Sequence, residues 1–123
     1  MNMDINRVDK NGVIIAVIQS DGHIITDTQS VLDLMATVRH ETDCDRIAIP
    51  KATVTEDFFV LSTGIAGEIL QKFVNDHCAL AIFGDYSRYT SKSLRDFIYE
   101  SNNGNHIFFV ATEQEAVEKL AKT

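Results

Sequence analysis

The sequence predicts an α/β fold in one domain, with a mixed sheet built from an N-terminal β-hairpin followed by parallel βα units. Two β-rich runs, at residues 3–9 and 13–19, are joined by Lys10-Asn11-Gly12. Asn-Gly is the strongest short hairpin signal because both residues tolerate a positive φ. Three short apolar runs follow, with helical segments between them, and such crossovers join parallel strands. The length of 123 residues suits a single domain over residues 1–123.

The segment after the hairpin is predicted to form a helix and a buried strand. Thr26-Asp27-Thr28-Gln29 has the spacing of a capping box, in which side chains at both ends of the first turn satisfy free N–H groups. The helix that it opens has one apolar face, which consists of Val31, Leu34, Met35 and Val38. A short interior strand at 46–49 ends at Pro50, because proline lacks the N–H that a central strand needs.

The second half of the chain is predicted to add two βα units and a terminal helix. In order, its elements are a longer connection at 51–61, a helix that begins at Ser62-Thr63-Gly64, a strand at 79–83, a helix with Leu94, Phe97 and Ile98 on its buried face, a strand at 107–110 and a helix opened by a capping box at 112–115. The spacing i, i+3, i+4 puts the three apolar residues of the middle helix on one face. Asn102-Asn103-Gly104 ends that helix, since Asn and Gly accept the left-handed conformation of a C-cap.

Composition and charge exclude several classes of protein. Hydrophobic residues make up 45% and charged residues 24% of the chain, which is typical of a folded domain rather than a disordered one. Eleven basic and eighteen acidic residues give a net charge of −7, which argues against binding to nucleic acid or to an anionic membrane surface. No apolar run reaches the ~20 residues of a membrane span, and the N-terminus lacks the apolar core of a secretory signal. We expect a cytoplasmic protein.

The cysteines and histidines predict neither a disulfide framework nor a metal site. Two cysteines, Cys44 and Cys78, in a chain without a secretory signal are typical of reduced, partly buried thiols. His40, Asp43 and Cys44 lie close in the sequence, but their spacing suits no standard zinc site. No serine, histidine and aspartate have the readable spacing of a nucleophilic triad. We therefore expect no metal, no cofactor and no catalytic residue.

Polar side chains gather in two loops that we expect at one rim of the sheet. Ligands of an open parallel sheet bind beyond the carboxyl ends of its strands. One loop is residues 61–64, at the start of the second helix, and the other is residues 84–92, after the strand at 79–83. The candidate binding residues are Ser62, Thr63, Gly64, Asp85, Tyr86, Arg88, Tyr89, Lys92 and Arg95.

These residue types have a functional and an ordinary interpretation. Tyrosine and arginine anchor protein interfaces, and lysine or arginine near a helix start can hold an anion. Ser62 and Thr63 at a helix N-terminus either cap the helix or favour a phosphate there, whether bound or added to the hydroxyl itself. The ordinary interpretation of residues 85–95 is a polar loop with a solvated first helical turn.

Two long stretches resemble a known family over nearly the whole chain. They are TGIAGEILQKFVNDHCALAIFGDYSRYTSKSLRDFIYESNNGNHIFF and DGHIITDTQSVLDLM, and they resemble a bacterial family catalogued as domain of unknown function 4180. That family has no assigned activity, so the resemblance implies none for this chain.

The order of elements is also similar to that of the STAS domain of anti-sigma factor antagonists. That family has an Asp-Ser-Ser/Thr-Gly motif at the start of its second helix, and the first hydroxyl of the motif is the site of regulatory phosphorylation. Ser62-Thr63-Gly64 match the last three positions, whereas Leu61 stands in place of the aspartate. The C-terminal FFVATEQEAVEKL resembles the last strand and helix of that domain. The resemblance implies a regulatory module with candidate phosphorylation at Ser62 or Thr63.

The sequence therefore predicts a non-catalytic, STAS-like regulatory or protein-binding module that contacts a protein partner through the rim. The alternative is a small-molecule-binding domain or an enzyme at the same rim. In that case Arg88, Lys92 and Arg95 hold an anionic ligand, and Tyr86 or Asp85 handles a proton. A closed concavity with converging polar groups favours the alternative, and a shallow rim favours the binding module. Because open strand edges pair readily, the N-terminal hairpin also predicts a homodimer.

Overall fold

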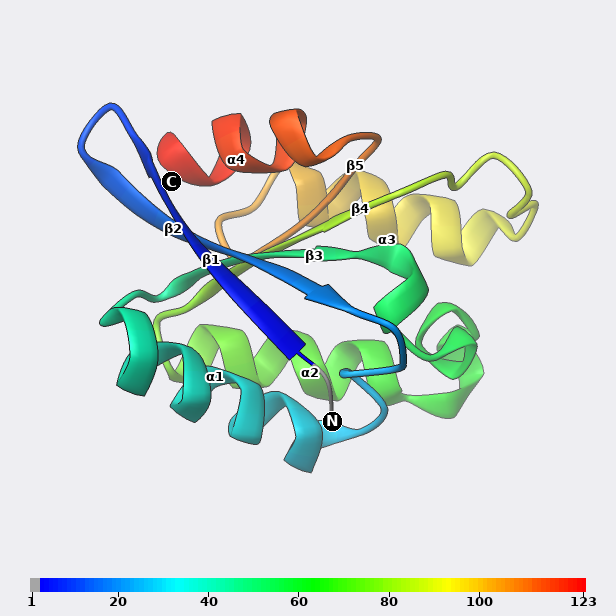
Figure 1. Cartoon of the computed structure of the whole chain (residues 1–123). Helices are drawn as coiled ribbons and strands as arrows, with labels where there is room; N and C mark the ends of the chain where they lie inside the picture. The colour runs from blue at the N-terminus through cyan, green and yellow to red at the C-terminus, as the bar shows by residue number, and fades with distance from the viewer. Residues whose placement is uncertain (1–2) are drawn as a thin grey trace.

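The N-terminal hairpin forms as the sequence predicts (Figure 1). In the computed structural model, which describes residues 3–123, strand β1 (Met3–Lys10) pairs antiparallel with β2 (Val13–Ser20). The two turn residues are in the left-handed region, with φ of 56° at Asn11 and 84° at Gly12. The Gly12 N–H also donates to Asp9 Oδ1 at 2.9 Å. The chemistry of the turn thus fixes the register of the hairpin.

Three parallel strands complete a mixed sheet of order β1-β2-β3-β4-β5. They are β3 (Arg46–Pro50), β4 (Ala79–Phe83) and β5 (Ile107–Val110). Helix α1 (Thr28–Thr42) connects β2 to β3, α2 (Ile65–Asn75) connects β3 to β4, α3 (Lys92–Asn102) connects β4 to β5, and α4 (Glu113–Ala121) follows β5. Each crossover carries the chain to the adjacent strand, and the predicted fold class is confirmed. Within residues 3–123, every helix is too short or too polar to span a bilayer.

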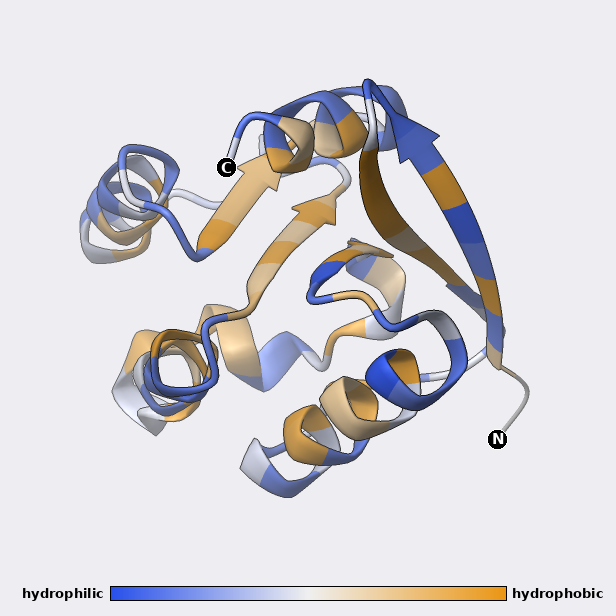
Figure 2. Cartoon of the chain, turned by 90° about the vertical axis from the view of Figure 1, so that its left-hand side faces the viewer, coloured by the Kyte–Doolittle hydropathy of each residue, from blue (hydrophilic) through white to orange (hydrophobic). Residues whose placement is uncertain are grey.

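The sheet separates two cores of different size. Helices α1 and α2 lie on one side of the sheet and α4 lies on the other (Figures 1 and 2). The larger core, on the side of α1 and α2, includes Ile18, Ile49, Phe58, Phe73 and Leu94. The smaller core, under α4, includes Ile15, Val17, Phe108 and Leu120. Strand β2 contributes to both cores because alternate residues of a strand face opposite sides of the sheet.

The capping box of α1 lies one residue later than predicted. Asp27, rather than Thr26, is the N-cap, and its carboxylate accepts a hydrogen bond from the Ser30 N–H at 2.8 Å. The Ser30 hydroxyl accepts in return from the Asp27 N–H at 3.1 Å. Because Ser30 supplies the reciprocal bond, Gln29 is free to donate to Asp33 Oδ1 at 3.0 Å.

Helix α3 differs from the sequence prediction in two respects. Of the three apolar residues predicted on its buried face, only Leu94 is fully buried, whereas Phe97 and Ile98 are half-buried, because α3 packs against the edge strand β5. Asn103 at the C-cap has a φ of −91°, and Gly104 is outside the left-handed region. The predicted left-handed C-cap is therefore wrong, since both N–H groups bond to carbonyls of the last turn without it.

The two edges of the sheet differ in how well they are covered. Within residues 3–123, the outer edge of β1 has no partner strand, and Asp4, Arg7 and Asp9 are exposed on this strand. At the β5 edge, the Asn102 side chain donates to Phe109 O at 3.1 Å and accepts from the Phe109 N–H at 2.7 Å. Asn102 thus satisfies backbone groups that another strand could otherwise use. The homodimer stays a prediction, with β1 as the edge that is open to a second copy.

Candidate functional site

The connection after β3 is a folded segment with its own buried side chains. It forms three short 3₁₀ helices, η1 (Lys51–Thr53), η2 (Glu56–Phe59) and η3 (Leu61–Thr63). Phe58 is 0% and Phe59 4% exposed. Val54 makes a parallel bridge to Ile25, which lies three residues before the start of α1. This packing holds the connection in place beyond the carboxyl end of β3.

A polar network centred on Glu56 joins this connection to the loop after β4. Glu56 Oε1 lies 2.5 Å from Arg88 Nη2 and 3.2 Å from Lys51 Nζ. The Tyr89 hydroxyl donates to Glu56 Oε2 at 3.0 Å. We call Lys51, Glu56, Arg88 and Tyr89 the Glu56 network. Sequence reasoning found Arg88 and Tyr89 but missed Lys51 and Glu56, because no local pattern in the connection marks them as partners of a loop some thirty residues away.

The charges of the network affect the carboxyl group at its centre. Burial raises the pKa of Glu56, but hydrogen bonds from Tyr89 and Lys51 and the charges of Lys51 and Arg88 lower it by more, to below its ordinary value of 4.5. Glu56 is therefore ionised at neutral pH and pairs with both cations. More than half of each side chain is exposed at Glu56 and Arg88, with 58% and 63% accessible, so a partner can reach both.

An aromatic platform supports the network. It consists of Phe59, Tyr86, Tyr89 and Phe109. The ring of Tyr89 stacks on Phe59 with centroids 5.2 Å apart, and Tyr86 packs edge-on against Phe109 at 5.6 Å. Lys51 Nζ lies 4.9 Å from the Tyr89 ring centroid, within cation–π range. The stacking and the hydrogen bonds together hold the Tyr89 side chain in one orientation.

Gly84 allows the loop after β4 to pass close to Lys51. A Cβ atom on Gly84 would lie 2.6 Å from Lys51 Cβ, which is inside van der Waals contact. The glycine is thus required by space rather than by its backbone conformation, since its φ is not positive. The close approach brings residues 84–91 against η1 and the Glu56 network.

Tyr86 and Asp85, the candidates for proton transfer in the alternative function, are both engaged within the loop. The Tyr86 hydroxyl donates to Ile82 O at 2.7 Å, and burial raises the pKa of Tyr86 far above its ordinary value. Asp85 Oδ1 accepts from the Ser87 N–H at 2.8 Å, and the hydrogen bonds from Ser87 lower the pKa of Asp85. Tyr86 therefore stays protonated and Asp85 stays ionised at neutral pH, so neither group is poised to exchange a proton.

The three cations predicted to hold an anion each have a separate acceptor within the chain. Arg88 pairs with Glu56. Lys92 Nζ lies 2.8 Å from Asp96 Oδ2, one turn later on α3, and Arg95 Nε donates to Tyr89 O at 3.3 Å. The three cations thus lie in one region of the molecule, but their charged groups do not point toward a common site that could hold an anion.

Ser62, Thr63 and Gly64 lie just before α2 rather than in its first turn. Helix α2 begins at Ile65, and its N-cap Gly64 has a φ of 79° and no side-chain capping bond. The prediction that the helix begins at Ser62 is wrong because this left-handed glycine separates η3 from α2. Among residues 3–123, no hydrogen bond, ion pair or ring contact joins residues 62–64 to residues 85–92. The loop after β4 instead contacts η2, where Arg88 bonds to Glu56 and Tyr89 stacks on Phe59.

The two hydroxyls before α2 have different surroundings. The Thr63 hydroxyl lies 2.9 Å from both Asp57 O and Val60 O and 3.3 Å from the Ile65 N–H. Ser62 is exposed, and within residues 3–123 its hydroxyl makes no hydrogen bond. Thr63 therefore stabilises the η2–η3 turn, whereas Ser62 is accessible from solvent.

A broad depression adjoins the aromatic platform at the carboxyl ends of β4 and β5. It has a volume of about 570 Å³ and is wide open to solvent. Its lining residues are Gly84, Asp85, Tyr86, Phe109, Val110, Ala111 and Glu115. The Glu115 carboxylate accepts from the Ala111 N–H at 3.0 Å, so the second acidic group of the depression is also engaged within the chain.

The opposite, amino-terminal end of the parallel strands carries a buried thiol. Cys78 Sγ lies 3.0 Å from Arg39 Nη2, and burial raises the pKa of Cys78 to about 11. Cys44 and Cys78 are both free and buried, as predicted. His106 Nδ1 lies 3.0 Å from Cys78 O and must carry the proton there, since a carbonyl only accepts. Residues 3–123 contain no group of three or more His, Cys, Asp or Glu side chains placed to share a metal ion.

Comparison with known proteins gives a family but no activity. Residues 10–120 match the model of a family described as a domain of unknown function, DUF4180. No curated protein matches the chain, and no solved structure does.

Proposed function

We propose that this chain, which belongs to the DUF4180 family, is a non-catalytic, STAS-like protein-binding module whose partner contacts the Glu56 network. The observation that carries the proposal is the network itself, with Arg88 and Tyr89 held in fixed orientations on the aromatic platform. Arginine and tyrosine are the residue types that dominate binding energy at protein interfaces. Side chains that are ordered before binding lose less conformational entropy when a partner arrives.

The shape and protonation of the region favour binding over catalysis. The adjoining depression is open, whereas small-molecule sites are clefts that enclose most of their ligand. Tyr86 and Asp85 have pKa values shifted away from neutrality, which makes both poor acid–base groups at pH 7. Val60, which directly follows η2 and is 50% exposed, adds an accessible apolar side chain to the same connection.

Within this proposal, Ser62 is the regulatory phosphorylation site. Its hydroxyl is exposed and makes no hydrogen bond to residues 3–123, whereas the Thr63 hydroxyl is bound to backbone carbonyls. A phosphate on Ser62 would add about −1.5 to −2 charge just before the first N–H groups of α2. Phosphopeptide mapping of the protein isolated from its native cells tests this point. Phosphate on Ser62 supports it, and phosphate on Thr63 alone, or on neither residue, overturns it.

Quantitative copurification tests the binding function. The bait is the full chain as wild type, as the double variant Arg88→Ala/Tyr89→Ala, and as Arg7→Ala, an exposed arginine on β1 that serves as the matched control. We expect at least one protein to be captured by the wild type and by Arg7→Ala but lost with the double variant. Equal capture of every protein by all three baits, with the double variant folded by circular dichroism, would overturn the proposal.

A further inference from the structure

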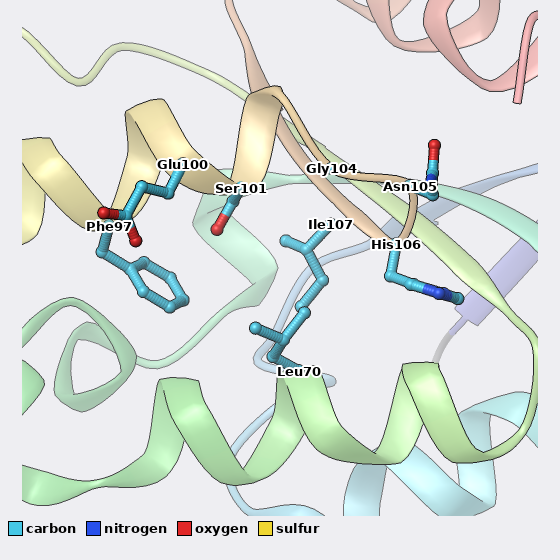
Figure 3. Close-up of a pocket in the computed structure, with 8 residues that line it drawn as sticks. All are labelled: Leu70, Phe97, Glu100, Ser101, Gly104, Asn105, His106 and Ile107. Carbon is cyan, nitrogen blue, oxygen red and sulfur yellow. The ribbon is translucent and has the colours of Figure 1, made fainter.

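A second concave site lies between α2, α3 and the start of β5, away from the rim. Its volume is about 200 Å³. Leu70 of α2 points toward Ile107 of β5, and the ring of Phe97 closes the side nearest the first turns of α3 (Figure 3). We call this site the α2–α3 pocket. Its walls are mainly apolar, as the walls of small-molecule sites generally are.

Ser101 is the buried polar side chain among those that line the α2–α3 pocket. Ser101 is only 9% exposed, and its hydroxyl points from α3 into the space between Phe97 and Ile107 (Figure 3). It makes no hydrogen bond within residues 3–123. The hydroxyls of Thr37 and Thr42 on α1 behave differently, since each donates to the carbonyl four residues earlier, at 2.8 and 2.7 Å.

The orientation of Ser101 has a physical consequence. The Ser101 oxygen is not closed off from solvent, since within residues 3–123 only Arg46 Nε is a fully buried side-chain nitrogen or oxygen without a partner. Water therefore meets the hydroxyl in the open pocket until a ligand group takes over its hydrogen bonds. Ser101 gives up the helix carbonyl that such a side chain ordinarily uses and presents both a donor and an acceptor to the pocket. A ligand group that can accept and donate at that point is the complement of this hydroxyl.

The other groups around the pocket restrict the charge of a ligand. Glu100 stands at its mouth (Figure 3), and the chain carries a net charge of −7, so an anionic ligand is disfavoured. His106, at the opposite end, has its Nδ1 proton committed to Cys78 O. No cation lines the pocket within the described residues. These charges would attract an ammonium group, but such a group only donates and must be desolvated against the apolar walls. An uncharged hydroxyl both donates and accepts, so it is the group that complements Ser101.

We propose that the α2–α3 pocket binds a small, uncharged aromatic alcohol, with the ring between Leu70, Phe97 and Ile107 and the hydroxyl group bonded to Ser101. The size suits a single ring, because an engineered apolar cavity of about 150 Å³ in another protein accepts benzene. The proposal is independent of the Glu56 network, which lies at the carboxyl ends of β3 and β4, whereas the pocket lies at the amino end of β5.

A pair of isosteric probes, phenol and toluene, tests the proposal by NMR titration of the ¹⁵N-labelled full chain. We expect phenol to produce saturable shifts at the amides of Ser101, Gly104 and Ile107, with a dissociation constant on the order of 1 mM. Ser101→Ala should weaken phenol binding about 2- to 10-fold, the worth of one hydrogen bond, and leave toluene binding unchanged. Ser93→Ala, an exposed serine on the same helix, is the matched control and should change neither.

A second variant guards against an uninformative result from Ser101→Ala. Leu70→Phe enlarges a half-buried side chain of the pocket wall and should abolish the shifts from both probes, while far-ultraviolet circular dichroism stays that of the wild type. The absence of saturable shifts at these three amides in the wild type overturns the proposal. Equal affinity for phenol and toluene in the wild type also overturns it, because the site would then be an unselective apolar hollow.

Discussion

The segments that follow β3 and β4 meet at the same rim, but they are stabilised in different ways. Residues 51–64 contain buried Thr53, Val54, Phe58 and Phe59. Residues 84–91 contain no fully buried side chain, and the half-buried rings of Tyr86 and Tyr89 rest on the first segment. The first segment is thus an extension of the core, and the second is ordered by contact with it. A destabilising substitution in residues 51–64 should therefore disturb both segments, whereas one in residues 84–91 should affect only that loop.

The largest effect is expected from Phe58→Ala in the first segment. Phe58 is 0% exposed and packs against the rings of Phe59 and Phe109. Removing the ring loses its burial and leaves a cavity, which typically lowers the free energy of unfolding by about 3–5 kcal/mol. Chemical denaturation measures the change, with half-exposed Val60→Ala in the same segment as the control. Equal stability of the two variants would contradict the core-like character of residues 51–64.

A smaller loss is expected from Gly84→Ala, which acts on the contact between the segments. The added methyl group would meet Lys51 Cβ, and overpacking of this kind costs about 1–3 kcal/mol. Gly67→Ala on α2 is the matched control, because nothing lies within 4 Å of its Cβ position. Alanine should raise stability there by about 0.5–1 kcal/mol, the usual gain inside a helix. Changes of the same sign in both variants would show that the close approach at Gly84 does not govern stability.

The same contrast explains which features the sequence could predict. The strands at 79–83 and 107–110 match their predicted bounds, and each strand of the hairpin is one residue longer than predicted. These elements were predictable because Asn-Gly turns and short apolar runs are local signals. The parallel direction of β3, β4 and β5 followed from the helical crossovers, but the order of the strands in the sheet did not. Residues 51–61 were predicted only as a connection without secondary structure. Short 3₁₀ turns leave no strong hydrophobic periodicity in the sequence, and Phe58 is buried through contacts with residues that are distant in sequence.

The candidate site was predictable only in part, for a related reason. The sequence located Arg88 and Tyr89 by their residue types in a polar loop. Their common partner Glu56 lies 32 residues before Arg88, and only the pairing of β3 with β4 brings the two loops together. Ser62 was identified from a short motif, but the left-handed Gly64 that separates it from α2 has no local signal strong enough to fix the helix start.

An intermediate effect is expected from Tyr86→Phe in the second segment. The substitution removes the hydroxyl that donates to Ile82 O at 2.7 Å and keeps the ring on the platform. The loss of one such hydrogen bond lowers the free energy of unfolding by about 1 kcal/mol. Tyr99→Phe on α3, where the side chain is 72% exposed, should leave stability unchanged. If both tyrosine variants unfold at the same denaturant concentration as the wild type, the Tyr86 bond does not anchor the loop.

A weaker, pH-dependent effect is expected from Glu56→Gln. The folded protein holds the pKa of Glu56 below 4.5, so the contribution of its ion pairs is present above that pH and is lost as the pH falls through the lowered value. Because the pair is largely exposed, the loss at pH 7 is a few tenths of a kcal/mol. Denaturation at pH 7 and at about pH 3 measures it. The difference between wild type and Glu56→Gln should shrink at the lower pH, and a difference that grows there would contradict the assignment.

The smallest change in stability, and the sharpest separation of stability from binding, is expected from Arg88→Ala. Arg88 is exposed, and it contacts the exposed Glu56 side chain and the ring of Tyr89. Its removal therefore leaves the buried contacts of residues 51–64 in place. The melting temperature should equal that of Arg7→Ala. The amount of partner captured through the Glu56 network should fall by about tenfold or more. Tyr86→Phe should show the reverse pattern, with lower stability and unchanged partner binding. The substitution keeps the aromatic ring of residue 86, which supports the Glu56 network. If Arg88→Ala melted at as low a temperature as Tyr86→Phe, Arg88 would contribute to stability and not only to binding. Residues 84–91 would then be part of the folded core, as residues 51–64 are, and the contrast between the two segments would not hold.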